Sequence, residues 1–204
     1  SHAGITLGED GATHQTMEDI ALMRALPGMV VINPCDYNQT KAATIAAAEY
    51  DGPVYLRFGR PGVPNFTAED QTFEIGKAIM MNEGRDVTIF ATGHLVWEAI
   101  QACGILEEEG ISAEIIDIAT IKPLDEAAVI ASARKTGAVV CAEEHNTPGG
   151  LGTGVLAQNC PTPMEFISGG DRFGQTGTPA ELMAAYGLDA AHIAEAARKA
   201  ISRK

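Results

Sequence analysis

Short apolar strands alternate with helices along most of this 204-residue chain, and that alternation restricts its fold more than any other feature. Runs such as MVVIN, DVTIF and AVVCA are mostly apolar, as expected of buried strands. The segments between them carry apolar residues at helical spacing. Alternation of this kind is typical of parallel sheets with helices packed on them, so the sequence predicts an α/β fold.

Two such regions are predicted, on either side of a stretch rich in proline and glycine. Residues 1–60 predict helix, strand, helix and strand, and residues 77–204 predict four strands alternating with four helices. Residues 61–76 show little periodicity and are predicted to be a linker. Two strands are too few for a covered parallel sheet, so we expect part of the first domain to precede Ser1.

Polar residues at the helix ends predict how the helices begin. Thr16 and Asp19 have the spacing of a capping box, which predicts a helix starting at Thr16. Asp125 and Asp189 are predicted N-caps of two later helices, and the His94 side chain is expected to cap another.

Charge and cysteine usage limit the possible partners and the compartment. The net charge of −13 argues against a nucleic-acid partner, and no apolar run approaches the ~20 residues of a membrane span. Four cysteines are widely spaced, which predicts free thiols rather than a disulfide framework: Cys35, Cys103, Cys141 and Cys160. We therefore expect a cytoplasmic protein.

The stretch HAGITLGEDGATHQ, residues 2–15, is unusually rich in turn-forming and polar residues. It could be an ordinary loop between a strand and a helix. It could supply metal ligands from His2, Glu9, Asp10 and His14, although none of these has a helical ligand spacing. It could also be a substrate loop, because glycine allows close approach, histidine transfers protons and aspartate accepts hydrogen bonds from hydroxyls.

Two further motifs contain candidate polar groups. In YLRFGRPG, Arg57 alternates with apolar residues and is expected to be structural, whereas Arg60 follows the strand and could bind a phosphate. EEHNTPGGLGTG matches neither a dinucleotide fingerprint nor a P-loop, so it predicts close backbone packing around a buried network of Glu143 and His145. His192 is expected to be solvated.

SHAGITLGEDGATHQTMEDIALMRALPGMVVINPCD resembles the signature of the transketolase family, in which a histidine precedes GEDG[PA][TS]HQ and a helix follows. GPVYLRFGRP is similar to the strand that carries the phosphate-binding arginine of that family. IDIATIKPLD, VVCAEEHNTPGGLGTGV and GTPAEL resemble its C-terminal domain. The resemblance implies that residues 1–60 are the C-terminal half of a pyrimidine-binding domain and residues 77–204 a transketolase C-terminal domain.

The resemblance also implies roles for individual residues. His14 falls on the histidine expected near the donor carbonyl oxygen, where it would assist proton transfer or stabilise the oxyanion. Asp10 falls on the aspartate that binds a substrate hydroxyl, and His2 and Arg60 fall on positions that bind the terminal phosphate of the sugar. Ala12 stands where proline is frequent, which should alter loop rigidity rather than chemistry. We expect the loop and Arg60 to converge in one pocket.

A transketolase moves a two-carbon ketol unit between phosphosugars in the pentose phosphate pathway, using thiamine diphosphate and Mg²⁺. The glutamate that protonates the aminopyrimidine, the metal ligands and the diphosphate contacts are all expected before Ser1 or in a separate N-terminal subunit. We therefore expect no metal ligand and no cofactor-binding residue in this chain, and no activity of the chain alone. The expected partners are an N-terminal subunit and a second copy of the chain.

Two alternatives stay open. The chain could belong to another thiamine-diphosphate enzyme, such as a 1-deoxyxylulose-5-phosphate synthase, although the length of SHAGITLGEDG and its histidine favour transketolase. It could also be a non-catalytic dimerisation or regulatory module. The second alternative predicts that replacing His14 or Asp10 leaves the assembled complex functional.

Overall fold

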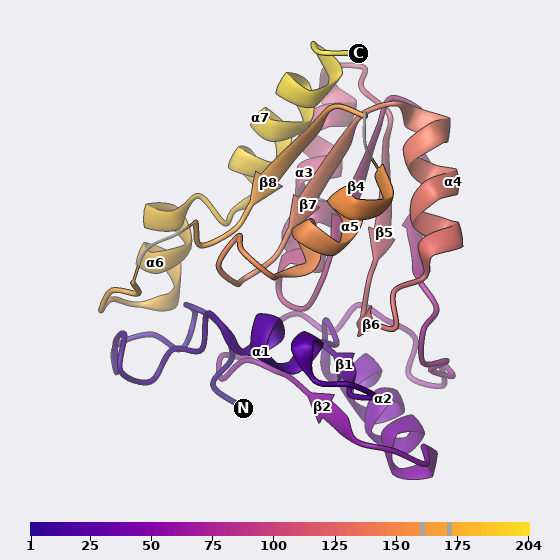
Figure 1. Ribbon diagram of the computed structural model, residues 1–204. Coiled ribbons are helices and arrows are strands. Elements are labelled where there is room, and N and C mark those ends of the chain that lie inside the picture. Colours follow the sequence, from indigo (N-terminus) through magenta and orange to yellow (C-terminus); the bar gives the residue numbers. More distant parts are fainter. Residues whose placement is uncertain (160–161, 171–172) are drawn as a thin grey trace.

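Two sheets carry the fold of the computed structural model, which describes residues 1–159, 162–170 and 173–204 (Figure 1). The strands are β1 (Val30–Ile32), β2 (Val54–Leu56), β3 (Ile79–Asn82), β4 (Val87–Ala91), β5 (Ala113–Asp117), β6 (Thr120–Lys122), β7 (Val139–Ala142) and β8 (Met164–Ile167). The helices are α1 (Asp19–Ala25), α2 (Tyr37–Glu49), α3 (Leu95–Glu108), α4 (Glu126–Thr136), α5 (Leu151–Asn159), α6 (Pro179–Tyr186) and α7 (Ala190–Ile201).

The five-stranded sheet has the order β3-β5-β4-β7-β8, and its last four strands are parallel. All residues of β4, β5 and β7 are buried, because helices cover both faces. Helices α3 and α7 pack on one face, and α4 and α5 on the other, which gives two separate apolar cores (Figure 1). The alternation of strands and helices predicted for residues 77–204 is therefore confirmed.

The three-stranded sheet, with the order β2-β1-β6, joins the two predicted regions. Strands β1 and β2 are parallel, as expected, but β6 from the second region pairs with β1 in the antiparallel direction. Ile121 of β6 packs with Ile20 and Val31 of the first region. The second region thus supplies the third strand of this sheet. Residues 61–76 contain no helix or strand, and the division into domains at these positions stays a prediction.

The start of α1 differs from the prediction. The helix begins at Asp19, and its N-cap residue Glu18 makes no side-chain capping bond. The predicted capping box is wrong because tertiary contacts occupy both of its side chains. The Thr16 hydroxyl donates to the His2 carbonyl (3.0 Å), and the Asp19 carboxylate accepts from Arg57 (2.8 Å).

The other caps are mostly as predicted. Asp125 and Asp189 accept hydrogen bonds from the first turns of α4 and α7. His94 occupies the N-cap position of α3, but its side chain makes no capping bond, so that prediction is wrong. Helix α6, with a capping box formed by Thr178 and Glu181, and the antiparallel edge strand β3 were not predicted.

The cysteines that the structure describes are free, as predicted, and all three are buried: Cys35, Cys103 and Cys141. Burial raises the pKa of each thiol, so none is a ready nucleophile. Cys160 lies outside the described residues. Within the described part of the chain, no helix has the length and apolar content needed to cross a membrane.

Asp117 is a fully buried carboxyl group at the end of β5, where the two regions meet. Its Oδ2 accepts a hydrogen bond from Gln39 of α2 (2.6 Å), and its Oδ1 has no partner among the described residues. Burial raises the pKa of Asp117 to about 7, and the hydrogen bond from Gln39 offsets only part of that effect.

The raised pKa of Asp117 predicts a specific pH dependence of stability. Between about pH 4 and pH 7 the folded state binds more protons at this site than the unfolded state, so the free energy of unfolding falls as pH rises through this window. We expect Asp117→Asn to remove about 2 kcal/mol of the decline between about pH 5 and pH 8. Urea unfolding at both pH values tests this, with the exposed Asp70→Asn as control. Equal declines in wild type and Asp117→Asn would contradict it.

Candidate functional site

Residues 2–16 form a loop whose two ends are hydrogen-bonded to each other. The Gly4 N–H donates to the Thr16 carbonyl (2.9 Å), and the Thr16 hydroxyl donates to the His2 carbonyl (3.0 Å). The Ala3 N–H donates to Phe58 just after β2 (3.3 Å). The loop is therefore closed at its base and fixed to the C-terminal end of β2, the edge of a parallel sheet where ligands commonly bind.

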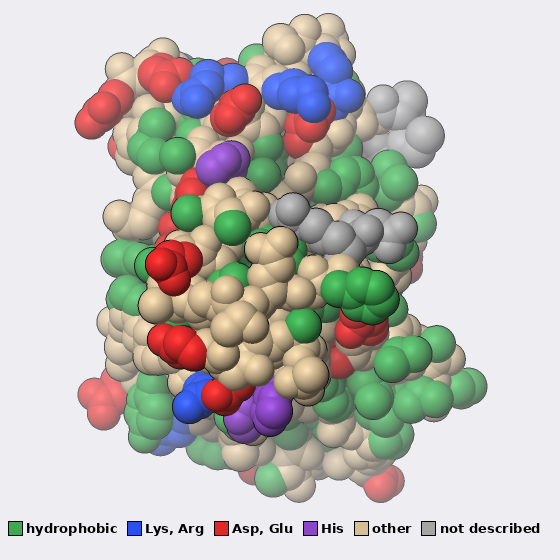
Figure 2. Space-filling view, turned by 90° about the vertical axis from the view of Figure 1, so that its left-hand side faces the viewer, with side chains coloured by type: hydrophobic (Ala, Val, Ile, Leu, Met, Phe, Trp, Pro, Cys, Tyr) green, Lys and Arg blue, Asp and Glu red, His purple; other side chains and the backbone are tan. Residues whose placement is uncertain are grey.

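The loop has a buried stem and an exposed tip. Residues 3–8 are buried, and Ile5 and Leu7 are almost completely inaccessible to solvent. Glu9, Asp10 and residues 12–14 are exposed. On the face in Figure 2, acidic, basic and histidine side chains lie together near the lower edge. The buried stem holds in place a tip that presents its polar side chains to solvent.

Asp10 and Arg60, far apart in the sequence, form an ion pair between Asp10 Oδ2 and Arg60 Nη1. The side chains are 46% and 53% exposed. A pair this exposed contributes at most ~1 kcal/mol, so a ligand oxyanion can compete for the guanidinium at little cost. The structure thus brings the loop tip and Arg60 together, and the convergence of both with His2 and His14 in one pocket stays a prediction.

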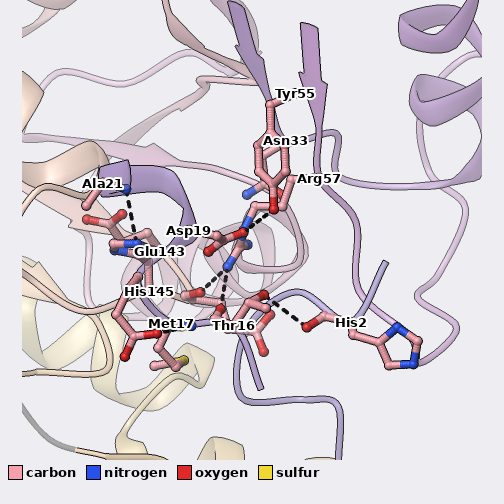
Figure 3. Close-up of polar contacts among 12 residues, drawn as sticks. His2, Thr16, Met17, Asp19, Ala21, Asn33, Tyr55, Arg57, Glu143 and His145 are labelled. Atoms are coloured by element: carbon pink, nitrogen blue, oxygen red, sulfur yellow. Dashed lines mark hydrogen bonds and ion pairs between the residues drawn. The ribbon is translucent and has the colours of Figure 1, made fainter. Parts of the chain in front are cut away.

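The two histidines of the loop are both exposed. His2 Nδ1 lies 3.0 Å from the Ser1 hydroxyl, and His14 Nδ1 lies 2.9 Å from the Thr13 hydroxyl. In Figure 3 the His2 imidazole points away from the buried polar groups next to the loop. His14 lies on the same loop tip as Asp10. The functional roles of His2, Asp10, His14 and Arg60 stay predictions.

Arg57 is structural, as the sequence analysis expected. It is 2% exposed, and its guanidinium donates to Asp19 (2.8 Å) and to the carbonyls of Thr16 (3.2 Å) and Glu144 (2.9 Å) (Figure 3). The Tyr55 hydroxyl also donates to Asp19 (2.8 Å). Burial alone would raise the pKa of Asp19, but the charge and hydrogen bond of Arg57 outweigh it and hold that pKa below its usual value.

Glu143 and His145 are both buried after β7, as predicted, but each binds backbone groups of its own rather than the other side chain. The Glu143 carboxylate accepts from the N–H groups of Leu151 (2.6 Å) and Gly152 (2.8 Å) at the start of α5. Burial raises the pKa of Glu143 to about 7. His145 Nδ1 donates to the Asn146 carbonyl (2.6 Å), and burial lowers the pKa of this histidine, so it is neutral.

The second region also contacts the loop tip, which the sequence analysis missed. A Cβ on Gly11 would overlap the Thr176 hydroxyl, and the Gln15 amide donates to the Gln175 carbonyl (2.8 Å). In Figure 1 the N-terminal loop lies next to the segment that leads into α6. The glycines at the loop tip could have indicated this contact, because glycine permits close approach of another segment.

A half-open pocket of about 350 Å³ lies beside Arg60, at the ends of β1 and β2. Its lining is mostly apolar and includes Pro34, Tyr37, Phe58, Pro61 and His94. None of these residues was predicted to bind a ligand. In the described part of the chain, no group of three or more His, Cys, Asp or Glu residues is arranged to hold a metal ion.

The fold and the candidate site define an α/β protein with a polar, partly exposed loop at the C-terminal end of parallel strands, where ligands commonly bind. Two family models identify the family, within that class, to which the chain belongs. The family model "Transketolase, pyrimidine binding domain" matches residues 1–65, and "Transketolase, C-terminal domain" matches residues 76–193. The chain belongs to the transketolase family.

Two curated relatives and one solved structure support the assignment to the transketolase family. The chain is 44% identical to a 6-deoxy-6-sulfo-D-fructose transketolase subunit of Clostridium sp. (strain MSTE9), covering 100% of this chain and 64% of the relative. It is 48% identical to a putative transketolase C-terminal section of Methanocaldococcus jannaschii, covering 96% and 63%. A split gene transketolase, solved as an inactive β4 tetramer, superposes with a TM-score of 0.90 at 45% identity and covers 98% of this chain and 65% of that one. The chain thus spans less than two thirds of the length of these proteins.

Proposed function

We propose that this chain is the C-terminal part of a transketolase, and that it transfers a two-carbon ketol unit between phosphosugars once assembled with an N-terminal partner. The observation that carries the proposal is the contact between Asp10, in the GEDGATHQ loop, and Arg60 at the end of β2. This contact joins a hydroxyl acceptor and an oxyanion-binding cation in one exposed site. Relatives described as transketolase subunits or sections support it.

The chain's own residues would bind and orient the sugar. Arg60 would exchange its Asp10 partner for the terminal phosphate, with His2 as a second donor. Asp10, released from Arg60, would accept a hydrogen bond from a substrate hydroxyl and so distinguish sugar configurations. His14 would move a proton at the donor carbonyl oxygen or stabilise the charge developing there.

Thiamine diphosphate, when bound, supplies the carbanion chemistry of this family. The match to a pyrimidine-binding domain implies this cofactor in the assembled enzyme. The donor set of this chain fits a sugar phosphate better than the diphosphate–metal end of the cofactor, because the loop offers exposed imidazoles and one carboxylate–guanidinium pair. We therefore assign Mg²⁺ and the diphosphate contacts to the N-terminal partner.

Reconstitution tests the proposal. The chain, an N-terminal transketolase subunit, thiamine diphosphate and Mg²⁺ are incubated with xylulose 5-phosphate and ribose 5-phosphate, and sedoheptulose 7-phosphate is measured. We expect product only when both subunits are present. Product from the chain alone would contradict the need for a partner. A verified complex without turnover of any ketol donor would contradict the proposed function.

The choice of donor requires a panel of sugars, because two relatives are named for 6-deoxy-6-sulfo-D-fructose and for apulose 4-phosphate. Sulfonate and phosphate are both oxyanions that a guanidinium can bind. A second candidate, 1-deoxy-D-xylulose-5-phosphate synthase, is favoured by relatives of that name at 35% and 37% identity. Pyruvate with glyceraldehyde 3-phosphate tests it in the same assay.

A further inference from the structure

The side chain of Glu144, two residues beyond β7, lies directly against the stem of the loop formed by residues 2–16. It is 3% exposed, and its Oε1 accepts a hydrogen bond from the Thr6 N–H. Gly4 has a φ of +73°, and a Cβ at that position would overlap the Glu144 carboxyl group. The stem is therefore shaped around a carboxylate that comes from the second region.

Arg57 fixes the backbone of Glu144. One guanidinium nitrogen, Nη2, donates both to the Glu144 carbonyl (2.9 Å) and to the Thr16 carbonyl (3.2 Å). The Thr16 carbonyl also accepts from the Gly4 N–H (2.9 Å). The side chain of Glu144 thus binds one end of the loop, and its backbone is tied through Arg57 to the other end.

The loop between these two ends carries Asp10 and His14. Ile5 packs in the large apolar core, and this packing together with the Glu144 contact defines one position for the stem. Loss of the carboxylate would leave the Thr6 N–H without its acceptor in a buried place, which is unfavourable. That cost favours movement of the stem, and movement of the stem displaces the tip.

We propose that Glu144 is a positioning residue for the substrate loop, by which the C-terminal domain sets the place of Asp10 and His14. The proposal rests on the proposed function, under which the loop of residues 2–16 binds the substrate. The anchoring itself rests on the Thr6, Gly4 and Arg57 contacts. Through Glu144, the second region holds in place a loop of the first region that carries Asp10 and His14.

Hydrogen exchange tests the anchoring without any need for activity. Amide exchange of residues 2–16 is compared in wild type, Glu144→Ala, Glu144→Gln and the exposed control Glu108→Gln. We expect loop amides to exchange about tenfold faster in Glu144→Ala. Glu144→Gln, which keeps a carbonyl acceptor for Thr6, should recover most of the protection, and Glu108→Gln should match wild type. Unchanged loop exchange in a folded Glu144→Ala overturns the proposal.

Kinetics of the reconstituted enzyme test the positioning. We expect Glu144→Ala to raise the KM for xylulose 5-phosphate about tenfold or more, because a small displacement of binding groups is costly, and Glu144→Gln to restore it. A purely structural residue would lower only the active fraction and hence kcat, leaving KM unchanged, and that result overturns the proposal. If the wild-type complex is inactive, the proposed function fails. Xylulose 5-phosphate binding measured by NMR then tests the positioning: weaker binding to Glu144→Ala than to wild type supports it, and equal binding overturns it.

Discussion

His14→Ala is expected to lower kcat/KM of the reconstituted enzyme by ~10²-fold or more, the usual effect of losing a positioned acid–base group. His14 lies on the exposed tip of a loop whose buried stem holds it in position, so it can act on a bound substrate. An exposed side chain contributes little to stability, so the variant should fold normally. The loss should therefore appear in the rate and not in the thermal unfolding midpoint.

The matched control for His14→Ala is His192→Ala on α7. His192 is also exposed, 48% by side chain, and its Nδ1 contacts Asp189 (2.7 Å) rather than any residue of the loop. We expect wild-type kcat/KM for this variant. Full activity of His14→Ala in a verified complex would contradict the proton-transfer role and favour the non-catalytic module considered from the sequence.

Arg57→Met is expected to lower the free energy of unfolding by about 3–5 kcal/mol, the range seen when one partner of a buried ion pair is removed. Asp19 would stay buried with its charge uncompensated, and the carbonyls of Thr16 and Glu144 would lose a donor. For a chain of this length, such a loss lowers the midpoint of thermal unfolding by roughly 6–20 °C. Urea and thermal unfolding followed by circular dichroism measure both quantities.

Arg198→Met provides the comparison for Arg57→Met. Arg198 pairs with Glu109 at 2.7 Å, but the two side chains are 40% and 42% exposed. An exposed pair contributes about 0–1 kcal/mol, so this variant should stay close to wild type. Equal destabilisation by the two substitutions would show that burial of the Arg57–Asp19 pair does not govern its contribution.

Most of the secondary structure could be predicted because its signals are local. The apolar runs of β4 and β7 and the capping aspartates Asp125 and Asp189 each act within a few residues of the chain. Strand β6 could not be found in this way. Its residues are only Thr120–Lys122, and they form a strand because β1 of the other region offers an unpaired edge.

The predicted capping box failed for the same reason: local spacing does not reveal the partners that the fold brings to a side chain. The spacing of Thr16 and Asp19 suits local capping, yet both side chains bind partners that the fold supplies. Arg57, just after β2, reaches Asp19, and leaving Arg57 without this buried partner would cost more than a capping bond worth about 1 kcal/mol. A local pattern therefore gave the correct helix with the wrong start.

By itself the sequence determined the α/β class, the family and the types of side chain on the loop of residues 2–16, because periodicity and motif are properties of neighbouring residues. Only the tertiary structure decided which groups meet: Asp10 with Arg60, Asp19 with Arg57, and Glu144 with the N–H of Thr6. A hydrogen bond or ion pair forms with whichever partner the packed chain brings within about 3 Å, and residue type alone does not fix that partner.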